Sequence, residues 1–441
     1  MQSFSIFNRV YRAFSTLFVI VVGLVAGQAY ASPEMIGELS ETRAMQVIII
    51  KGEKIPTLLN QASDDYSIMA VSGDKLTAIP FQFDDWNERG FPYVPGGTLK
   101  IDGVEGIIEP QDELVFMLRD LGPQADDVLK NLEEGSLLAE LAFVEDGVER
   151  YAYIVKGNSQ RSDKKYTYYN IETGLLKTTK YSLQTDPDNL LVWSDMLYEG
   201  YEGGTKTILD TMKLRVKARL GFIKATISNN LIPSEVVAVK NGPVRSLIAL
   251  DASISIFGVA LADAGASVTM TDQTLQFPVY LTIPKAASIL SNLLLEVSLD
   301  FNDMPDAKVR TELGPKEPIL AGNEDKGGNP EDYNIDLEHS WLSLSTEKDW
   351  DIIAFFSGKT GFKPTLNALY KDSRYNEKAD SPERFEGSAP HVGYLVEDIV
   401  YGESIVIGID LFFDDAFWSK DGLENSVHML RNPMPLSVNI I

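Results

Sequence analysis

The sequence predicts a mainly β protein: an N-terminal β-module followed by a large antiparallel β-sandwich, with few short helices. Short apolar runs rich in Val, Ile, Thr, Tyr and Phe recur at a spacing of roughly ten residues. Gly, Asn, Asp and Pro, which favour turns, separate these runs. Long amphipathic helices do not alternate with the strands, so a parallel β/α arrangement is not expected.

The first predicted strands contain two pairs of neighbours. Apolar runs at 79–83 and 113–118 are expected to pair, and Asp146-Gly147 predicts a tight hairpin between two further runs. A boundary near 158–163 is expected, which gives a signal peptide at 1–31, a β-module at 32–160 and a sandwich at 161–441. The strands expected first along the chain are 45–50, 77–83, 113–118, 137–143, 150–155 and 166–171.

The second part of the chain contains longer alternating runs. In 212–219 apolar residues alternate with Lys213, Arg215, Lys217 and Arg219, which predicts a half-buried strand with one cationic face. The segment 286–295 fits either a short helix or a strand, 364–371 is expected to be a short helix, and 315–333 a surface loop. The remaining strands expected here are 222–228, 236–239, 244–251, 253–260, 267–270, 276–283, 341–344, 351–356, 392–397 and 405–413.

The N-terminus has the pattern of a cleaved export signal. Arg9 and Arg12 precede an apolar core at 17–27, and Ala29-Tyr30-Ala31 provides a cleavage pattern before Ser32. The apolar core is short for a membrane span, and no comparable run follows it. The sequence therefore predicts a periplasmic or extracellular protein cleaved after Ala31, without a transmembrane span in the mature chain. An uncleaved N-terminal anchor is the alternative.

Composition narrows the classes of partner. The net charge is −25, and removing the leader deletes two arginines and no acid. An acidic surface of this kind is a poor partner for nucleic acid and for an anionic membrane. The chain has no cysteine, which excludes disulfides, a thiolate nucleophile and thiolate-bound metal. Oligomeric state is not predicted.

The segment after the 79–83 strand combines aromatic rings with polar side chains. Sugars are bound by stacking on aromatic rings while acids and amides contact the hydroxyls, so this loop is the candidate ligand site. Packing of the same rings in the protein's own core is the alternative. The candidate ligand-binding residues are Asp84, Asp85, Trp86, Asn87, Arg89 and Tyr93.

An acidic turn lies between this loop and the 113–118 strand. Hard cations such as Ca²⁺ need several oxygen ligands on a tight loop. The side chains of Asp102, Glu105, Glu109 and Asp112 are close enough in sequence to converge, although the spacing is not that of an EF-hand. A Ca²⁺ site is one interpretation, and a solvated turn tied to backbone N–H groups is the other. No other cofactor is predicted.

The three histidines give little local support for chemistry. His339, His391 and His428 are far apart in sequence and form no zinc-binding spacing. The pattern of a serine-hydrolase elbow or a phosphate-binding loop is also absent from the sequence. His339 and His391 are the candidates for an acid or base, each with a structural role as the alternative.

Two short motifs carry a resemblance to a known family. Asn241-Gly242-Pro243-Val244-Arg245 enters an apolar strand, and Pro80, Gln82 and Asp84 precede the Asp112-Glu113-Leu114-Val115-Phe116 run. Both are similar to segments of the galactose-mutarotase-like β-supersandwich proteins, which include polysaccharide lyases. The resemblance covers short motifs within about residues 45–300, and it implies a carbohydrate-related exported β-protein without supplying a catalytic set.

The expected function is carbohydrate binding by an exported β-sandwich protein. Activity on polysaccharide, in addition to binding, is left open. A lyase would need a base and a cation near the carbon next to a uronate carboxylate, and Arg245 with His339 are the candidates for those roles. The alternative from another class is a non-catalytic structural or assembly protein of the cell envelope. Sparse histidine and diffuse acidity fit that alternative.

Overall fold

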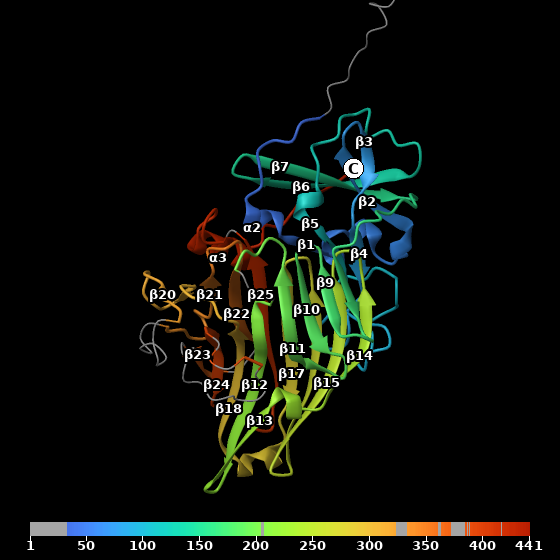
Figure 1. The fold of residues 1–441 in the computed structure, drawn as a ribbon. Helices are drawn as coiled ribbons and strands as arrows, with labels where there is room; N and C mark the ends of the chain where they lie inside the picture. The colour runs from blue at the N-terminus through green and yellow to red at the C-terminus, as the bar shows by residue number, and fades with distance from the viewer. Residues whose placement is uncertain are drawn as a thin grey trace, which may run out of the picture.

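The mainly β class is confirmed. The computed structural model describes residues 33–203, 207–322, 333–359, 363–371, 384–385, 387, 389–415 and 417–441. The named strands form antiparallel sheets, and the described residues contain two α-helices, α2 (Glu41–Ala44) and α3 (Leu423–Arg431). A smaller N-terminal region caps one end of a long β-sandwich (Figure 1).

Two sheets build the N-terminal region. β5 (Glu113–Met117) lies between β1 (Val47–Lys51) and β4 (Phe81–Asp84), which confirms the predicted pairing of the 79–83 and 113–118 runs. The expected 77–83 strand is divided at Pro80, because proline lacks the N–H that a sheet ladder needs. The second sheet consists, in spatial order, of β26 (Ser437–Ile440), β6 (Ser136–Glu145), β7 (Val148–Lys156), β2 (Tyr66–Ser72) and β3 (Lys75–Ala78).

The turn between β6 and β7 has the predicted chemistry. Asp146 and Gly147 have φ values of 48° and 80°, as a tight two-residue hairpin turn requires. The other neighbour of β6 is the C-terminal strand β26, so the last residues of the chain complete the N-terminal sheet. The boundary near 158–163 stays a prediction.

The sandwich packs a nine-stranded sheet against two smaller sheets. The four-stranded sheet consists of β11 (Asn189–Tyr198), β10 (Tyr181–Asp186), β9 (Leu175–Thr178) and β8 (Thr167–Asn170). The five-stranded sheet consists of β13 (Ile223–Ser228), β12 (Leu209–Leu220), β18 (Ser291–Phe301), β24 (His391–Glu397) and β23 (Thr365–Lys371). The nine-stranded sheet consists of β14 (Ser234–Asn241), β15 (Ser246–Ile256), β16 (Val259–Met270), β17 (Thr274–Thr282), β25 (Ser404–Asp414), β22 (Asp351–Lys359), β21 (Leu342–Ser345), β19 (Lys308–Thr311) and β20 (Ile319–Leu320).

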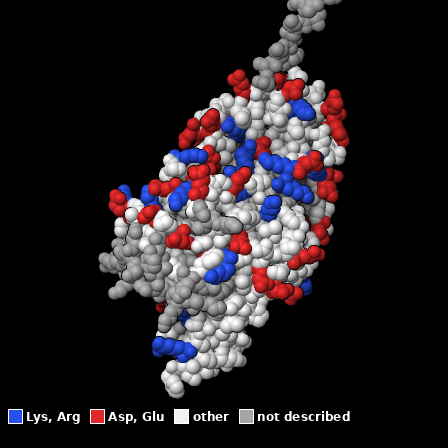
Figure 2. Space-filling view, in the orientation of Figure 1, with Lys and Arg blue, Asp and Glu red and all other residues white. Residues whose placement is uncertain are grey.

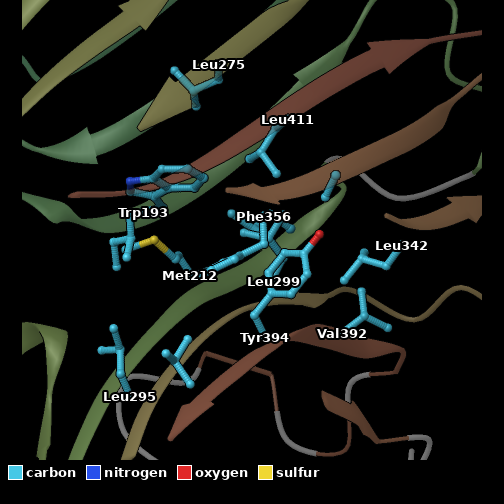
Figure 3. Packing of buried hydrophobic residues seen from close by; sticks show 14 of the residues in the cluster. Trp193, Met212, Leu275, Leu295, Leu299, Leu342, Phe356, Val392, Tyr394 and Leu411 are labelled. Carbon is cyan, nitrogen blue, oxygen red and sulfur yellow. The ribbon is translucent and has the colours of Figure 1, made fainter. Parts of the chain in front are cut away.

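The space between the sheets is filled with hydrocarbon side chains. Trp193 from β11, Met212 from β12 and Leu299 from β18 meet Leu275 and Leu411 of the nine-stranded sheet (Figure 3). A cavity of about 170 Å³ inside this core is lined almost entirely by apolar residues. Polar chemistry must therefore be sought on the outer faces of the sheets.

Three local predictions need correction. Residues 364–371, expected to be helical, form β23, because β24 pairs with them along their whole length and would otherwise have an unpaired edge. The expected strand 253–260 is interrupted by a hairpin turn at Phe257-Gly258. The ambiguous segment 286–295 divides into the 3₁₀ helix η6 (Lys285–Ile289) and the start of β18.

Some features lie outside these predictions. Helix α3 was not predicted, and the export signal and most of the expected 315–333 loop lie outside the described residues. Over the part of the chain that the structure describes, helices are all too short or too polar to cross a membrane.

Candidate functional site

The residues of the two sequence motifs meet in one buried ion network, here called the latch. Asp84 accepts hydrogen bonds from Arg245 Nε at 2.7 Å and forms an ion pair with Lys240 Nζ at 2.8 Å. Arg245 also donates to Glu113 at 2.7 Å. The amide oxygen of Gln82 accepts from the backbone N–H groups of Val244 and Arg245 at 3.1 and 3.0 Å, and its NH₂ group donates to Asp84. The latch thus ties β4 and β5 of the N-terminal region to the strand entry of β15.

The latch assigns structural roles to two predicted site residues. Although burial alone raises the pKa of Asp84, Arg245 and Lys240 bring it below its ordinary value, so Asp84 is a buried carboxylate. Arg245 is equally buried and engaged by two carboxylates. The assignment of Asp84 to a solvent-facing ligand site and of Arg245 to catalysis is corrected on this basis.

The predicted aromatic loop contacts the protein itself. The Lys51 ammonium lies 3.7 Å from the centre of the Trp86 ring. Phe91 stacks on Tyr280 of β17 at 6.2 Å between ring centres, and Arg89 lies over the same ring at 5.1 Å. These contacts place the loop against the nine-stranded sheet.

The remaining polar residues of this loop shape its backbone. The side-chain Oδ1 of Asn87 accepts from the N–H groups of Arg89 and Phe91 at 3.0 and 3.3 Å, and Asn87 is buried. The carboxylate of Asp85 accepts from Gly106 N–H at 3.2 Å, and its carbonyl accepts from Tyr93 N–H at 2.7 Å. Several polar groups of the loop are thus used internally, and its role as a ligand site stays a prediction.

The carboxylates of the acidic turn accept hydrogen bonds from backbone N–H groups. Asp112 accepts from the N–H groups of Trp86 and Glu109 at 3.2 and 2.8 Å, and Glu109 accepts from Val104 N–H at 3.3 Å. Burial raises the pKa of Asp112 to about 6. Throughout the described residues, groups of three or more acidic or histidine side chains placed to hold a metal ion are absent, and a Ca²⁺ site at Asp102, Glu105, Glu109 and Asp112 stays a prediction.

The two candidate histidines lie in different surroundings. His339 is about half exposed, and its Nδ1 lies 3.1 Å from Asp336. His391 is completely buried, and its Nε2 forms a 2.7 Å hydrogen bond with Ser298 Oγ. Arg245, His339 and His391 therefore belong to three separate networks, and the predicted partnership of Arg245 with His339 is not found.

His391 belongs to a polar cluster on the outer face of the five-stranded sheet, here called the polar face. Because side chains alternate along a strand, Lys213, Arg215 and Lys217 point away from the core that Met212 enters. The register sets Glu296 opposite Arg215, Ser298 opposite Lys213 and Asp300 opposite His391. The members of the polar face are Lys213, Arg215, Lys217, Glu296, Ser298, Asp300 and His391.

Ion pairs connect the members of the polar face. Glu296 accepts from Lys217 Nζ at 2.7 Å and lies 3.4 Å from Arg215, while Lys213 forms an ion pair with Asp300. Glu296 also lies 4.0 Å from His391 Nε2. Most of these side chains are buried, whereas the Lys217 side chain is 42% exposed and connects the cluster to solvent.

The ring of His391 retains one unused nitrogen. Burial, together with Lys213, Lys371, Arg215 and Lys217, places the pKa of His391 well below its ordinary value, so the ring is neutral near pH 7. Within the described residues, the buried Nδ1 atom has no hydrogen-bond partner. A neutral ring carries one proton, so Nδ1 is a donor or an acceptor according to the tautomer. A ligand hydroxyl can satisfy either form.

Three members of the polar face were not predicted from the sequence. Glu296, Ser298 and Asp300 alternate with apolar residues in a strand that begins inside the ambiguous 286–295 segment. Charge complementarity was the sequence feature that could have identified them. Glu296 and Asp300 lie on one face of their strand and complement the cationic face predicted for 212–219. Strand order, which the sequence did not specify, was needed to bring them together with His391.

Comparisons with known proteins return only distant likenesses of fold. No family model and no curated protein matches the chain. An α-mannosidase and a glycosyl hydrolase family 38 protein, both from Enterococcus faecalis, match with a TM-score of 0.46 each, at 10% and 9% identity. These matches cover 94% of this chain, which spans only 46% and 48% of the two proteins.

A third match concerns a smaller protein. An Escherichia coli protein with a provisional assignment as an aldose 1-epimerase matches with a TM-score of 0.30 and 10% identity, over 56% of this chain and 98% of that protein. These likenesses concern chain topology, and function has to be argued from the residues of this chain.

Proposed function

We propose that this is an exported protein that binds acidic carbohydrate at the polar face. The carrying observation is the buried His391 Nδ1, which has no partner among the described residues although it lies in a cluster of charged groups. Buried polar atoms in folded proteins are nearly always hydrogen-bonded, so such an atom indicates a missing partner. The export pattern at residues 1–31 and the absence of cysteine support an extracytoplasmic setting.

The charge of the cluster supports an anionic ligand. Four cations, Lys213, Arg215, Lys217 and Lys371, act on His391, and among the described residues Glu296 and Asp300 are the carboxylates of the polar face. Guanidinium and ammonium groups bind carboxylates through charge-assisted hydrogen bonds, and a uronic acid combines such a carboxylate with the hydroxyls that His391 can bind.

The same groups are suited to acid–base chemistry. Neutral His391 can accept a proton, and the neighbouring cations can stabilise negative charge on a uronate carboxylate. Proton abstraction next to that carboxylate is therefore the reaction class to assay once binding is established. His391 replaces the predicted His339 in this role, and Lys213 with Arg215 replaces Arg245.

Calorimetric titration with oligouronates and with neutral oligosaccharides of equal length tests this proposal. Wild-type protein is expected to bind the oligouronate, and Lys217→Ala to bind it about tenfold more weakly through the loss of one charge-assisted hydrogen bond. Arg219→Ala is the matched control, because Arg219 lies two residues along the same face of β12, beside Ser291 and Lys224. Equal binding of neutral and acidic sugars, or equal losses in both variants, would contradict the proposal.

A further inference from the structure

Three turns meet at the end of the sandwich that lies away from the N-terminal region (Figure 1). They are the β12–β13 hairpin at Gly221-Phe222, the β15–β16 hairpin at Phe257-Gly258 and the helix η6. The pairing of Arg219 with Ser291 sets η6 beside the first hairpin, and η6 also contacts β16. We call residues 219–225, 254–260 and 285–292 the tip.

The tip exposes large apolar side chains. Phe222 is 95% exposed, Ile289 56%, Ile223 50% and Phe257 38%. Single exposed apolar residues are common on proteins, but a group of four on adjoining turns is a feature of interaction surfaces. The tip is therefore more apolar than a solvated end of a sandwich requires.

One of these residues occupies an unfavourable backbone position. Phe257 has a φ of +54° and Gly258 a φ of +74°, in a two-residue turn between Ile256 and Val259. Asn or Asp is the usual residue at the first position of such a turn, and left-handed φ is costly for a bulky side chain. A phenylalanine that holds a left-handed φ and leaves over a third of its side chain exposed is a candidate for contact with a partner.

The charge of the tip differs from that of the whole protein. Arg219, Lys224 and Lys285 are its charged residues, and its sequence contains no acid, whereas the chain carries −25. Asp263 stands at the level of Thr282. Asp398 and Glu403 belong to the loop between β24 and β25, which reaches the tip where Glu403 lies opposite Ile283 and Tyr401 donates a hydrogen bond to the Leu290 carbonyl, so these two acids adjoin the three cations. In Figure 2 the acidic residues are spread over the visible upper surface, and none is visible at the lower end.

From these observations we infer that the tip is a docking surface for an anionic lipid bilayer. Phe222, Phe257 and Ile289 enter the boundary between headgroups and acyl chains, and Lys224 with Lys285 lie beside the lipid phosphates. Apolar side chains flanked by basic residues are the combination that binds peripheral proteins to anionic membranes. The polar face lies farther along the same sheet, so docking does not depend on the proposed sugar binding.

Vesicle flotation tests this inference with the expected exported form, residues 32–441, which contains every described residue. The probes are vesicles of phosphatidylcholine alone and of phosphatidylcholine with an equal part of phosphatidylglycerol. Wild-type protein is expected to float with the mixed vesicles and to be released by salt. Phe222→Ser is expected to weaken binding at least about tenfold, as loss of one buried phenylalanine predicts.

Two further variants complete the design. Lys224→Glu with Lys285→Glu is expected to remove the preference for the anionic vesicles, because each basic residue contributes about fivefold in affinity at such a surface. Tyr168→Ser, which removes a 52% exposed aromatic residue on β8, is the control and is expected to bind normally. Unchanged melting temperatures show that the variants remain folded.

Three results would overturn the inference. Wild-type protein that ignores the anionic vesicles excludes membrane docking, and Phe222→Ser binding like Tyr168→Ser excludes the tip as the surface. Concentration-dependent dimerisation that Phe222→Ser abolishes, without vesicle binding, would assign the tip to contact between copies of the chain.

Discussion

The latch and the polar face are both buried clusters of charged residues, and they differ in how completely they are paired. The latch pairs its charged and polar groups by hydrogen bonds across the two regions of the protein, through Asp84, Glu113, Gln82 and Arg245. In the polar face, His391 keeps a buried ring nitrogen for which the described residues provide no partner. Burial and charge alone therefore do not mark a functional site. The two clusters differ in that a buried ring nitrogen of the polar face is left without a hydrogen-bond partner among the described residues.

The largest expected effect comes from breaking the latch. Asp84→Ala leaves the Arg245 guanidinium buried with one of its carboxylates removed, which should lower the free energy of unfolding by about 3–5 kcal/mol. Urea denaturation measures this change. Asp85→Ala is the control, because Asp85 is only half-buried and accepts one hydrogen bond from Gly106 N–H. This substitution should lower the free energy of unfolding by about 1 kcal/mol. Equal, small effects of both variants would show that the latch does not join the two regions.

Removing the Trp86 ring should have the next largest effect. Trp86→Ala loses a half-buried ring and its contact with Lys51, so the free energy of unfolding should fall by about 2–3 kcal/mol. Trp86→Phe should recover much of this loss. The affinity for oligouronate, measured by calorimetry, should be unchanged in folded Trp86→Ala protein. Loss of binding would show that the aromatic loop, and not the polar face, is the ligand site.

The polar face should be recognisable by its pH dependence. The pKa of His391 is lowered in the folded protein, so below about 6.5 the unfolded chain takes up a proton that the folded chain excludes. His391 therefore contributes a loss of stability as the pH drops from 6.5, of at most about 1.4 kcal/mol per pH unit. Asp112, Asp351 and Asp410, whose pKa values are raised to about 6, contribute the opposite slope, so the readout is the difference between wild-type and His391→Gln protein in denaturation curves at pH 7, 6 and 5. The wild type should lose stability relative to His391→Gln as the pH falls, and parallel curves would contradict this assignment.

The contribution of the latch to stability should be lost at a lower pH than that of the polar face. The pKa of Asp84 lies below 3.8 in the folded protein, so its contribution is present above that value and is lost as the pH falls further. Wild-type and His391→Gln proteins should share this acid transition, and Asp84→Asn should lack it. A common transition for both clusters near pH 6 would contradict the distinction between them.

The smallest expected effect concerns the acidic turn. Added Ca²⁺ should change the melting temperature by less than about 1 °C, because ligand binding to the folded state alone would raise it. Asp112 and Glu109 already accept hydrogen bonds from backbone N–H groups. A clear increase in melting temperature that Asp112→Asn abolishes would restore the cation-site interpretation.

Periodicity predicted most of the strands, because alternation of apolar residues depends on neighbouring residues alone. It failed where tertiary pairing decides: β23 has a short, helix-compatible sequence and becomes a strand because β24 needs a partner. The motifs around Asp84 and Arg245 were correctly singled out, but their contact crosses about 160 residues of chain and was not visible in the sequence. The polar face was predicted only through the cations of 212–219, since its acids and His391 come from strands whose order no local pattern gives.

The central claim, that His391 contacts an acidic sugar, can be tested by NMR, because the chain contains only three histidines. With ¹⁵N-labelled histidine, titration of oligouronate should shift the ring nitrogens of His391, most strongly Nδ1, while those of His339 and His428 stay constant. His391→Gln identifies the resonances. Binding that leaves the His391 ring unchanged, or that shifts His339 instead, would contradict the account.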